Sequence, residues 1–213
     1  LLLQRLNPSE KDTAITTVEA LVYVPKLNQG DIVYPEQIWC GMGSGSIVIF
    51  KRAIGSETWN FETQMSCAND RVSCLLAVGS SRVWAGSLDA TIYVFDRCTY
   101  KANQHLEEHS DIISAMILQQ KDGQSIIWSA SLNGQIIGWD AEALIPKKKI
   151  KLKHPSRTFV SFLLIGKYFW CDIKSAIMLV DSTGEGDIEN KLEVKDGKKV
   201  LSVDCMISVS SEQ

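Results

Sequence analysis

The sequence predicts an all-β fold built from a structural repeat. Four tryptophans recur at intervals of 45, 44 and 42 residues, at Trp39, Trp84, Trp128 and Trp170. Each lies in a short apolar run, and a second apolar run follows it after a turn of small or polar residues. Such a pair of runs is typical of a β-hairpin. Helical repeats would need amphipathic runs of about ten or more residues, whereas these segments are short and rich in Val, Ile, Phe and Trp.

Length, composition and charge are those of a globular protein and exclude several classes. The chain has 213 residues, of which 45% are hydrophobic and 22% charged, and its formal net charge is −3. No basic field therefore attracts nucleic acid. The apolar runs are far shorter than the roughly 18–20 residues of a membrane-spanning helix, and the N-terminus carries no secretory signal pattern. The six cysteines form no CxxC pair, which favours buried thiols in a reducing compartment.

Four hairpins are expected, one at each repeated tryptophan. Their turns are Gly43-Ser44-Gly45, Leu88-Asp89-Ala90, Leu132-Asn133-Gly134 and Ile173-Lys174-Ser175. Asn133-Gly134 is the clearest of them, because both residue types tolerate the positive φ of a type I′ turn.

A strand-like run precedes each hairpin, and a more polar run follows it. The preceding runs span residues 16–24, 72–78, 112–118 and 159–165, and a fifth spans residues 203–209. In the best following run, residues 147–153, Lys149, Lys151 and Lys153 alternate with Ile150 and Leu152. The predicted unit is therefore four antiparallel strands, of which the last and most polar lies at the outer edge.

Four strands in each repeat of about 40–45 residues are the signature of a β-propeller blade. Blades stack around a central axis because one blade cannot bury both of its faces. We expect residues 1–213 to form one incomplete propeller. Its full blades are expected at about 15–66, 70–109, 110–155 and 156–196, with partial blades at 1–14 and 197–213. Since WD-type propellers most often have seven blades, the chain is expected to be a fragment of a longer, seven-bladed propeller.

One blade carries the residues of a WD repeat, which makes the expected fold WD40-like. Trp139-Asp140 is the WD dipeptide, and two others, ending at Asp96 and Asp181, are degenerate versions of it. A full WD repeat connects a His, a turn Asp, a Ser or Thr and the Trp by hydrogen bonds. The corresponding residues here are His109, Asn133, Ser129 and Trp139. This constellation braces a blade and performs no chemistry.

With these motifs, residues 36–213 resemble the C-terminal WD-repeat propeller of the DENN domain-containing protein 3 family. The segments RVWAGSLDATIYVFD, SIIWSASLNGQIIGWDAEAL and YFWCDIKSAIMLVD carry the resemblance. It implies a large cytoplasmic protein, peripheral on membranes, whose separate DENN module promotes nucleotide exchange on a Rab-type GTPase in vesicle trafficking. Any exchange activity would belong to that module and not to these residues. Related hairpins occur in propellers of Roco-type kinases and of some Rho exchange factors, so these stay open as alternatives.

No catalytic, metal or cofactor site is predicted. The glycine-rich run 41–45 lacks the spacing of a nucleophile elbow and the lysine of a P-loop. His105 and His109 lie four residues apart without a local set of carboxylates. The leading interpretation is a non-catalytic platform that binds proteins, either other domains of the same chain or small-GTPase machinery. Two alternatives are regulation in cis of an exchange or kinase module and, more remotely, a propeller enzyme with a site in the central channel.

Two features are candidate contact surfaces. The lysine-rich run contains Lys147, Lys148, Lys149, Lys151 and Lys153. It suits weak contact with anionic lipid or an acidic protein, but lysines also protect an outer edge strand from aggregation. Trp59 lies outside the repeated position and either packs on the outer strand or anchors a partner. An insertion at 25–36 lengthens the first connecting loop.

Overall fold

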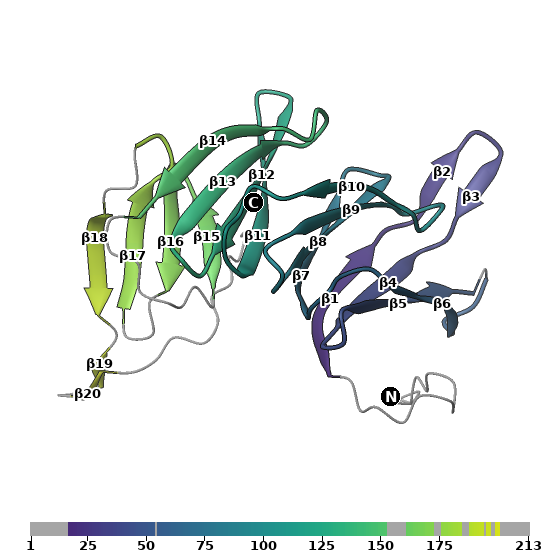
Figure 1. The fold of residues 1–213 in the computed structure, drawn as a ribbon. Coiled ribbons are helices and arrows are strands. Elements are labelled where there is room, and N and C mark those ends of the chain that lie inside the picture. Colours follow the sequence, from purple (N-terminus) through teal and green to yellow (C-terminus); the bar gives the residue numbers. More distant parts are fainter. Residues whose placement is uncertain are drawn as a thin grey trace. The chain divides into compact units, whose positions relative to one another are not determined.

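The computed structural model describes residues 17–53, 55–152, 161–172, 176–184, 188–193, 195–196 and 199–200. All regular structure in these residues is β-strand, which confirms the predicted all-β class. Figure 1 shows successive antiparallel sheets of four strands, accompanied by two short hairpins. The chain divides into two compact units. Unit 1 contains residues up to Ser87 together with Tyr93–His105, and unit 2 contains Leu88–Ile92 together with residues from Leu106 onward.

Unit 1 contains the first sheet and most of the second. The first sheet has the order β1-β4-β5-β6, with β1 (Val18–Val24), β4 (Gln37–Met42), β5 (Ser46–Arg52) and β6 (Trp59–Ser66). The second has the order β10-β9-β8-β7, with β7 (Val72–Val78), β8 (Arg82–Ser87), β9 (Ile92–Asp96) and β10 (Ala102–Leu106). The insertion at 25–36 is more than a loop, because β2 (Leu27–Gln29) and β3 (Ile32–Tyr34) pair within it as a hairpin.

Unit 2 contains the third and fourth sheets. The third consists of β11 (Ile113–Lys121), β12 (Gln124–Ser131), β13 (Gln135–Asp140) and β14 (Pro146–Lys151). The fourth consists of β15 (Phe162–Ile165), β16 (Tyr168–Asp172), β17 (Ala176–Asp181) and β18 (Ile188–Glu193). A short hairpin, β19 (Lys195–Asp196) with β20 (Lys199–Val200), follows. The four-stranded antiparallel units are as predicted. The expected segments 1–14 and 203–209 and the turn 173–175 lie outside the described residues.

Each unit has an apolar core in which a repeated tryptophan packs against aromatic residues of a second sheet. In unit 1, the Trp39 ring lies 5.9 Å from that of Phe95, between centroids. In unit 2, the Trp128 ring meets that of Phe169 edge-on at 4.8 Å. A large ring at this position fills the layer between two sheets, which gives the repeat its physical reason. Trp84 is also fully buried, whereas Trp170 is partly exposed.

The turn at Asn133-Gly134 is not the predicted type I′ turn. Gly134 has a φ of 81°, but Asn133 is outside the left-handed region. The amide of Gly134 donates to the carbonyl of Ser131 at 2.9 Å, so a tight turn is followed by one left-handed glycine, as in a G1 bulge. The Asn133 side chain accepts a hydrogen bond from the amide of Gln135 at 2.9 Å. This local bond suits an asparagine that keeps negative φ.

The left-handed position recurs in the first three hairpins, and alanine occupies one of them. The φ angles are 79° at Gly45, 68° at Ala90 and 81° at Gly134. Because a Cβ makes this conformation costly by about 1–2 kcal/mol, we expect Ala90→Gly to raise the free energy of unfolding by about 0.5–1 kcal/mol. Urea denaturation measures the change. Gly134→Ala is the reciprocal control and should be destabilising. A loss of stability in Ala90→Gly would contradict the prediction.

Candidate functional site

The third sheet brings together three of the four predicted WD-repeat residues. His109 precedes β11, Ser129 lies on β12 and Trp139 on β13, and all three are buried. The Nε2 atom of His109 and the Oγ atom of Ser129 are hydrogen bonded at 2.6 Å, and Nε1 of Trp139 donates to the same Oγ at 2.8 Å. The hydroxyl of Ser129 therefore connects β12 and β13 to the segment that precedes β11.

Asn133 does not take the expected place beside His109. Its side-chain amide donates to Oγ of Ser110 at 3.0 Å, and Oε1 of Gln135 lies 3.2 Å from Nδ1 of His109 instead. Gln135 was not among the predicted residues, although it follows the predicted turn by one position. Together, His109, Ser129, Trp139 and Gln135 form a hydrogen-bonded brace inside the sheet.

Burial lowers the pKa of His109 from its usual 6.5 to about 4, and the positive charges of Lys149 and Lys151 act in the same direction. The imidazole is therefore neutral in the folded protein at pH 7. The unfolded chain takes up a proton near pH 6.5, so the free energy of unfolding should fall as the pH falls from about 6.5 to about 4.

We expect His109 to remove about 2 kcal/mol of stability between pH 7 and pH 5. Urea unfolding at the two pH values measures this loss. His109→Gln is the matched variant, because it keeps a polar side chain that does not titrate. A variant with the same dependence on pH as the parent would show that His109 is not the responsible group.

The aspartates of the WD-type dipeptides cap the loops that follow the third strand of the second, third and fourth sheets. Oδ1 of Asp96, Asp140 and Asp181 accepts hydrogen bonds at 2.7–2.9 Å from backbone amides two or three residues further along. Hydrogen bonds from the amide of Ala143, and then from Lys147, lower the pKa of Asp140 to about 2. The bond from Lys167 is the main cause of the lowered pKa of Asp181. These carboxylates therefore hold loops in place.

The described lysines of the predicted basic surface have partners within the chain. Nζ of Lys147 lies 2.9 Å from Asp140, and that of Lys149 lies 2.7 Å from Glu108. Two further lysines donate to backbone carbonyls: Lys148 to Ser182 and Lys151 to Asn133, at 2.9 and 2.8 Å. Lys153 lies outside the described residues. These contacts favour a protected edge strand over a free basic surface for lipid.

Trp59 is partly buried at the start of β6. It packs against an apolar cluster on one face of the first sheet, formed by Cys40, Met42, Val48 and Phe50. This contact favours a packing role over that of an exposed anchor.

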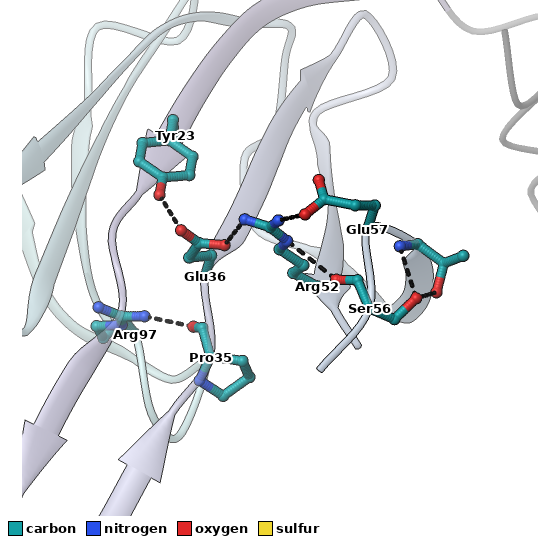
Figure 2. Close-up of polar contacts among 8 residues, drawn as sticks. Tyr23, Pro35, Glu36, Arg52, Ser56, Glu57 and Arg97 are labelled. Carbon is teal, nitrogen blue, oxygen red and sulfur yellow. Dashed lines mark hydrogen bonds and ion pairs between the residues drawn. The ribbon is translucent and has the colours of Figure 1, made fainter. Parts of the chain in front are cut away.

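A polar network that the sequence pattern did not indicate holds the end of the insertion, as Figure 2 shows. The hydroxyl of Tyr23 donates to Glu36 at 2.7 Å, and Arg52 forms an ion pair with the same carboxylate at 2.7 Å. Arg52 also contacts Glu57 and donates from Nε to the carbonyl of Ser56 at 3.1 Å. The bonds from Tyr23 and Arg52 lower the pKa of Glu36. The network joins β1, the start of β4 and the β5–β6 turn.

Four-stranded antiparallel sheets, which in each unit bury a tryptophan between them, are consistent with a β-propeller-like fold. No protein-family model matches the chain. It is 25% identical over 194 residues to DENN domain-containing protein 3 of Mus musculus, an alignment that covers 89% of this chain. The chain spans only 14% of the length of that curated relative. The identity supports a relationship between the two proteins.

Two further findings concern the described residues only. They contain no helix that is long and apolar enough to span a bilayer. They also contain no group of three or more His, Cys, Asp or Glu side chains placed to hold a metal ion.

Proposed function

We propose that this chain is part of a WD-type β-propeller that acts as a non-catalytic protein-interaction platform in a DENN-type exchange factor for Rab GTPases. The observation that carries the proposal is the 25% identity to DENN domain-containing protein 3 over 89% of the chain. The protein would act in vesicle trafficking, in the cytoplasm and at the surface of membranes. Its partners would be other domains of the same protein or small-GTPase machinery.

The propeller would have the four full blades expected from the repeat, at about 15–66, 70–109, 110–155 and 156–196, and would close with further blades. The fourth sheet supports further stacking. One of its faces is buried through Phe169, Met178 and Val180, while Trp170 and Leu179 on the other face stay partly exposed. Because a blade cannot bury both faces alone, this second apolar face suits another blade.

The brace around Ser129 supports a scaffold role. Hydrogen bonds among buried side chains fix β12, β13 and the segment before β11 relative to one another. A rigid sheet of this kind presents its connecting loops in a constant arrangement, which is what recognition through loops requires. Several charged side chains of unit 2 hold strands and loops in place, among them Lys148, Lys151 and Asp140, which supports a structural use of these residues.

The test compares the complete exchange factor with a version that lacks the propeller. If the propeller is a platform, its deletion should leave the rate of GDP release from the Rab unchanged but abolish binding of a partner or the normal location in cells. A change of several-fold in GDP release would instead support regulation in cis. Turnover of a substrate by the isolated, complete propeller would support the enzyme alternative.

A further inference from the structure

Arg97, which directly follows β9, is a buried cation in unit 1. Only 1% of its surface is exposed, and among the described residues no carboxylate lies within ion-pair distance of it. Burial lowers the pKa of its guanidinium, and its Nε atom has no hydrogen-bond partner in the part of the chain that the structure describes. Burying a charge without an ion pair is costly, so its retention here needs a reason.

The guanidinium group bonds to both ends of the insertion. Nη1 donates to the carbonyl of Pro25, and Nη2 donates to the carbonyl of Pro35 at 2.9 Å, as Figure 2 shows for Pro35. The β2–β3 hairpin lies between these two prolines. The planar guanidinium therefore binds both ends of the hairpin at once, through two separate N–H groups. A lysine has a single ammonium group and lacks this planar, two-pronged geometry.

The backbone of Arg97 is itself fixed. Its amide donates to the carbonyl of Ser81 at 2.9 Å, and its carbonyl accepts a hydrogen bond from Nε2 of the buried Gln37 at 3.2 Å. These bonds connect Arg97 to the β7–β8 turn and to the first residue of β4. The backbone from which the Arg97 side chain extends is therefore held in place. We call the bonds of this side chain to Pro25 and Pro35 the Arg97 clamp.

We propose that Arg97 is a positioning residue that makes the β2–β3 hairpin a rigid arm of unit 1. An isolated two-stranded hairpin is marginally stable at best, and each of these strands has only three residues. Ile32 and Val33 are 58% and 45% exposed, so the tip of the hairpin gains little from burial. Its order must come from its base, where the Arg97 clamp and the Glu36–Arg52 ion pair hold it.

The clamp makes a specific prediction about local and global stability. Replacing a buried, unpaired charge with an apolar side chain of similar length is often neutral or stabilising for the fold. Arg97→Met should therefore loosen the hairpin without weakening the sheets. Arg97→Lys keeps a positive charge but loses the fork, so it should loosen the hairpin as well.

Amide hydrogen exchange of the full chain tests the proposal. In both variants we expect at least a tenfold faster exchange for residues 26–34, with exchange in β5 and the urea midpoint changed little. Arg71→Met, which alters a half-exposed arginine of the same unit, is the control and should leave residues 26–34 unchanged. The proposal is overturned if residues 26–34 exchange equally fast in the parent and the variants. It is also overturned if β5 loosens as much as the hairpin, since Arg97 would then support the fold as a whole. If Arg97→Met does not fold, Arg97→Lys decides by the same criteria.

Discussion

Ser129→Ala is expected to lower the free energy of unfolding by about 2–4 kcal/mol, because one hydroxyl serves two buried side chains. The Oγ atom accepts the indole N–H of Trp139 and is hydrogen bonded to Nε2 of His109, at 2.8 and 2.6 Å. Its removal leaves two polar groups without a partner in a region that water does not reach. Each buried, unsatisfied group costs roughly 1–3 kcal/mol. Urea denaturation with tryptophan fluorescence measures the loss.

Ser131→Ala is the matched control, because both serines are fully buried on β12. The hydroxyl of Ser131 makes one hydrogen bond, to the carbonyl of Asp111 at 2.9 Å, so its loss should cost only about 1 kcal/mol. In a His109→Phe background, Ser129→Ala should cost less than in the parent, since one of its two partners is already gone. Equal costs for the two serine variants would show that the brace adds nothing to stability.

The repeat and its strands could be predicted because both depend on local sequence. Inner strands covered on both faces read as continuous apolar runs, and turn residues separate them. The tryptophan spacing follows because each repeated tryptophan lies on the second strand of its sheet. The same pattern of apolar runs and turn residues recurs along the chain, so each copy supports the strands predicted for the others. The number of blades and the closure of a propeller stay predictions, because they depend on contacts beyond the described residues.

The polar contacts could be predicted only in part. The sequence indicated His109, Ser129 and Trp139 because they match a known pattern, but Asn133 bonds elsewhere and Gln135 lies beside the imidazole. The bulge at the turn decides whether the side-chain amide of Asn133 or that of Gln135 reaches Nδ1 of His109. The sequence does not specify the geometry of this bulge.

Arg97 was missed for a different reason. Its two carbonyl partners, Pro25 and Pro35, lie 72 and 62 residues away along the chain, so no local pattern connects them. An arginine next to a turn is normally expected on the surface. Only the close approach of the two sheets of unit 1 places it beneath the insertion.

Gly138→Val is expected to lower the free energy of unfolding by about 3 kcal/mol, by forcing the buried Trp128 ring from its place. Gly138 lies on β13, directly opposite Trp128 on β12. A Cβ at position 138 would lie 2.6 Å from Cζ3 of Trp128, well inside van der Waals contact. The displaced ring would lose its edge-on contact with Phe169 and the hydrogen bond from its Nε1 to Gln119, at 2.9 Å.

The first sheet shows why a side chain at position 138 would clash with Trp128. The clash comes from the direction in which the Trp128 ring points, and not from pairing a tryptophan with a larger residue on the next strand. Trp39 is paired with Ile49 there, and its Nε1 donates to Gln37 on its own strand. A β-branched residue is thus tolerated opposite a tryptophan whose ring lies elsewhere. Gly184→Val is the control, because a Cβ at 184 would meet its nearest neighbour at 3.5 Å, an ordinary contact. Near-ultraviolet circular dichroism should show the Trp128 ring disturbed in Gly138→Val only, and an unchanged spectrum with parental stability would refute the proposed clash.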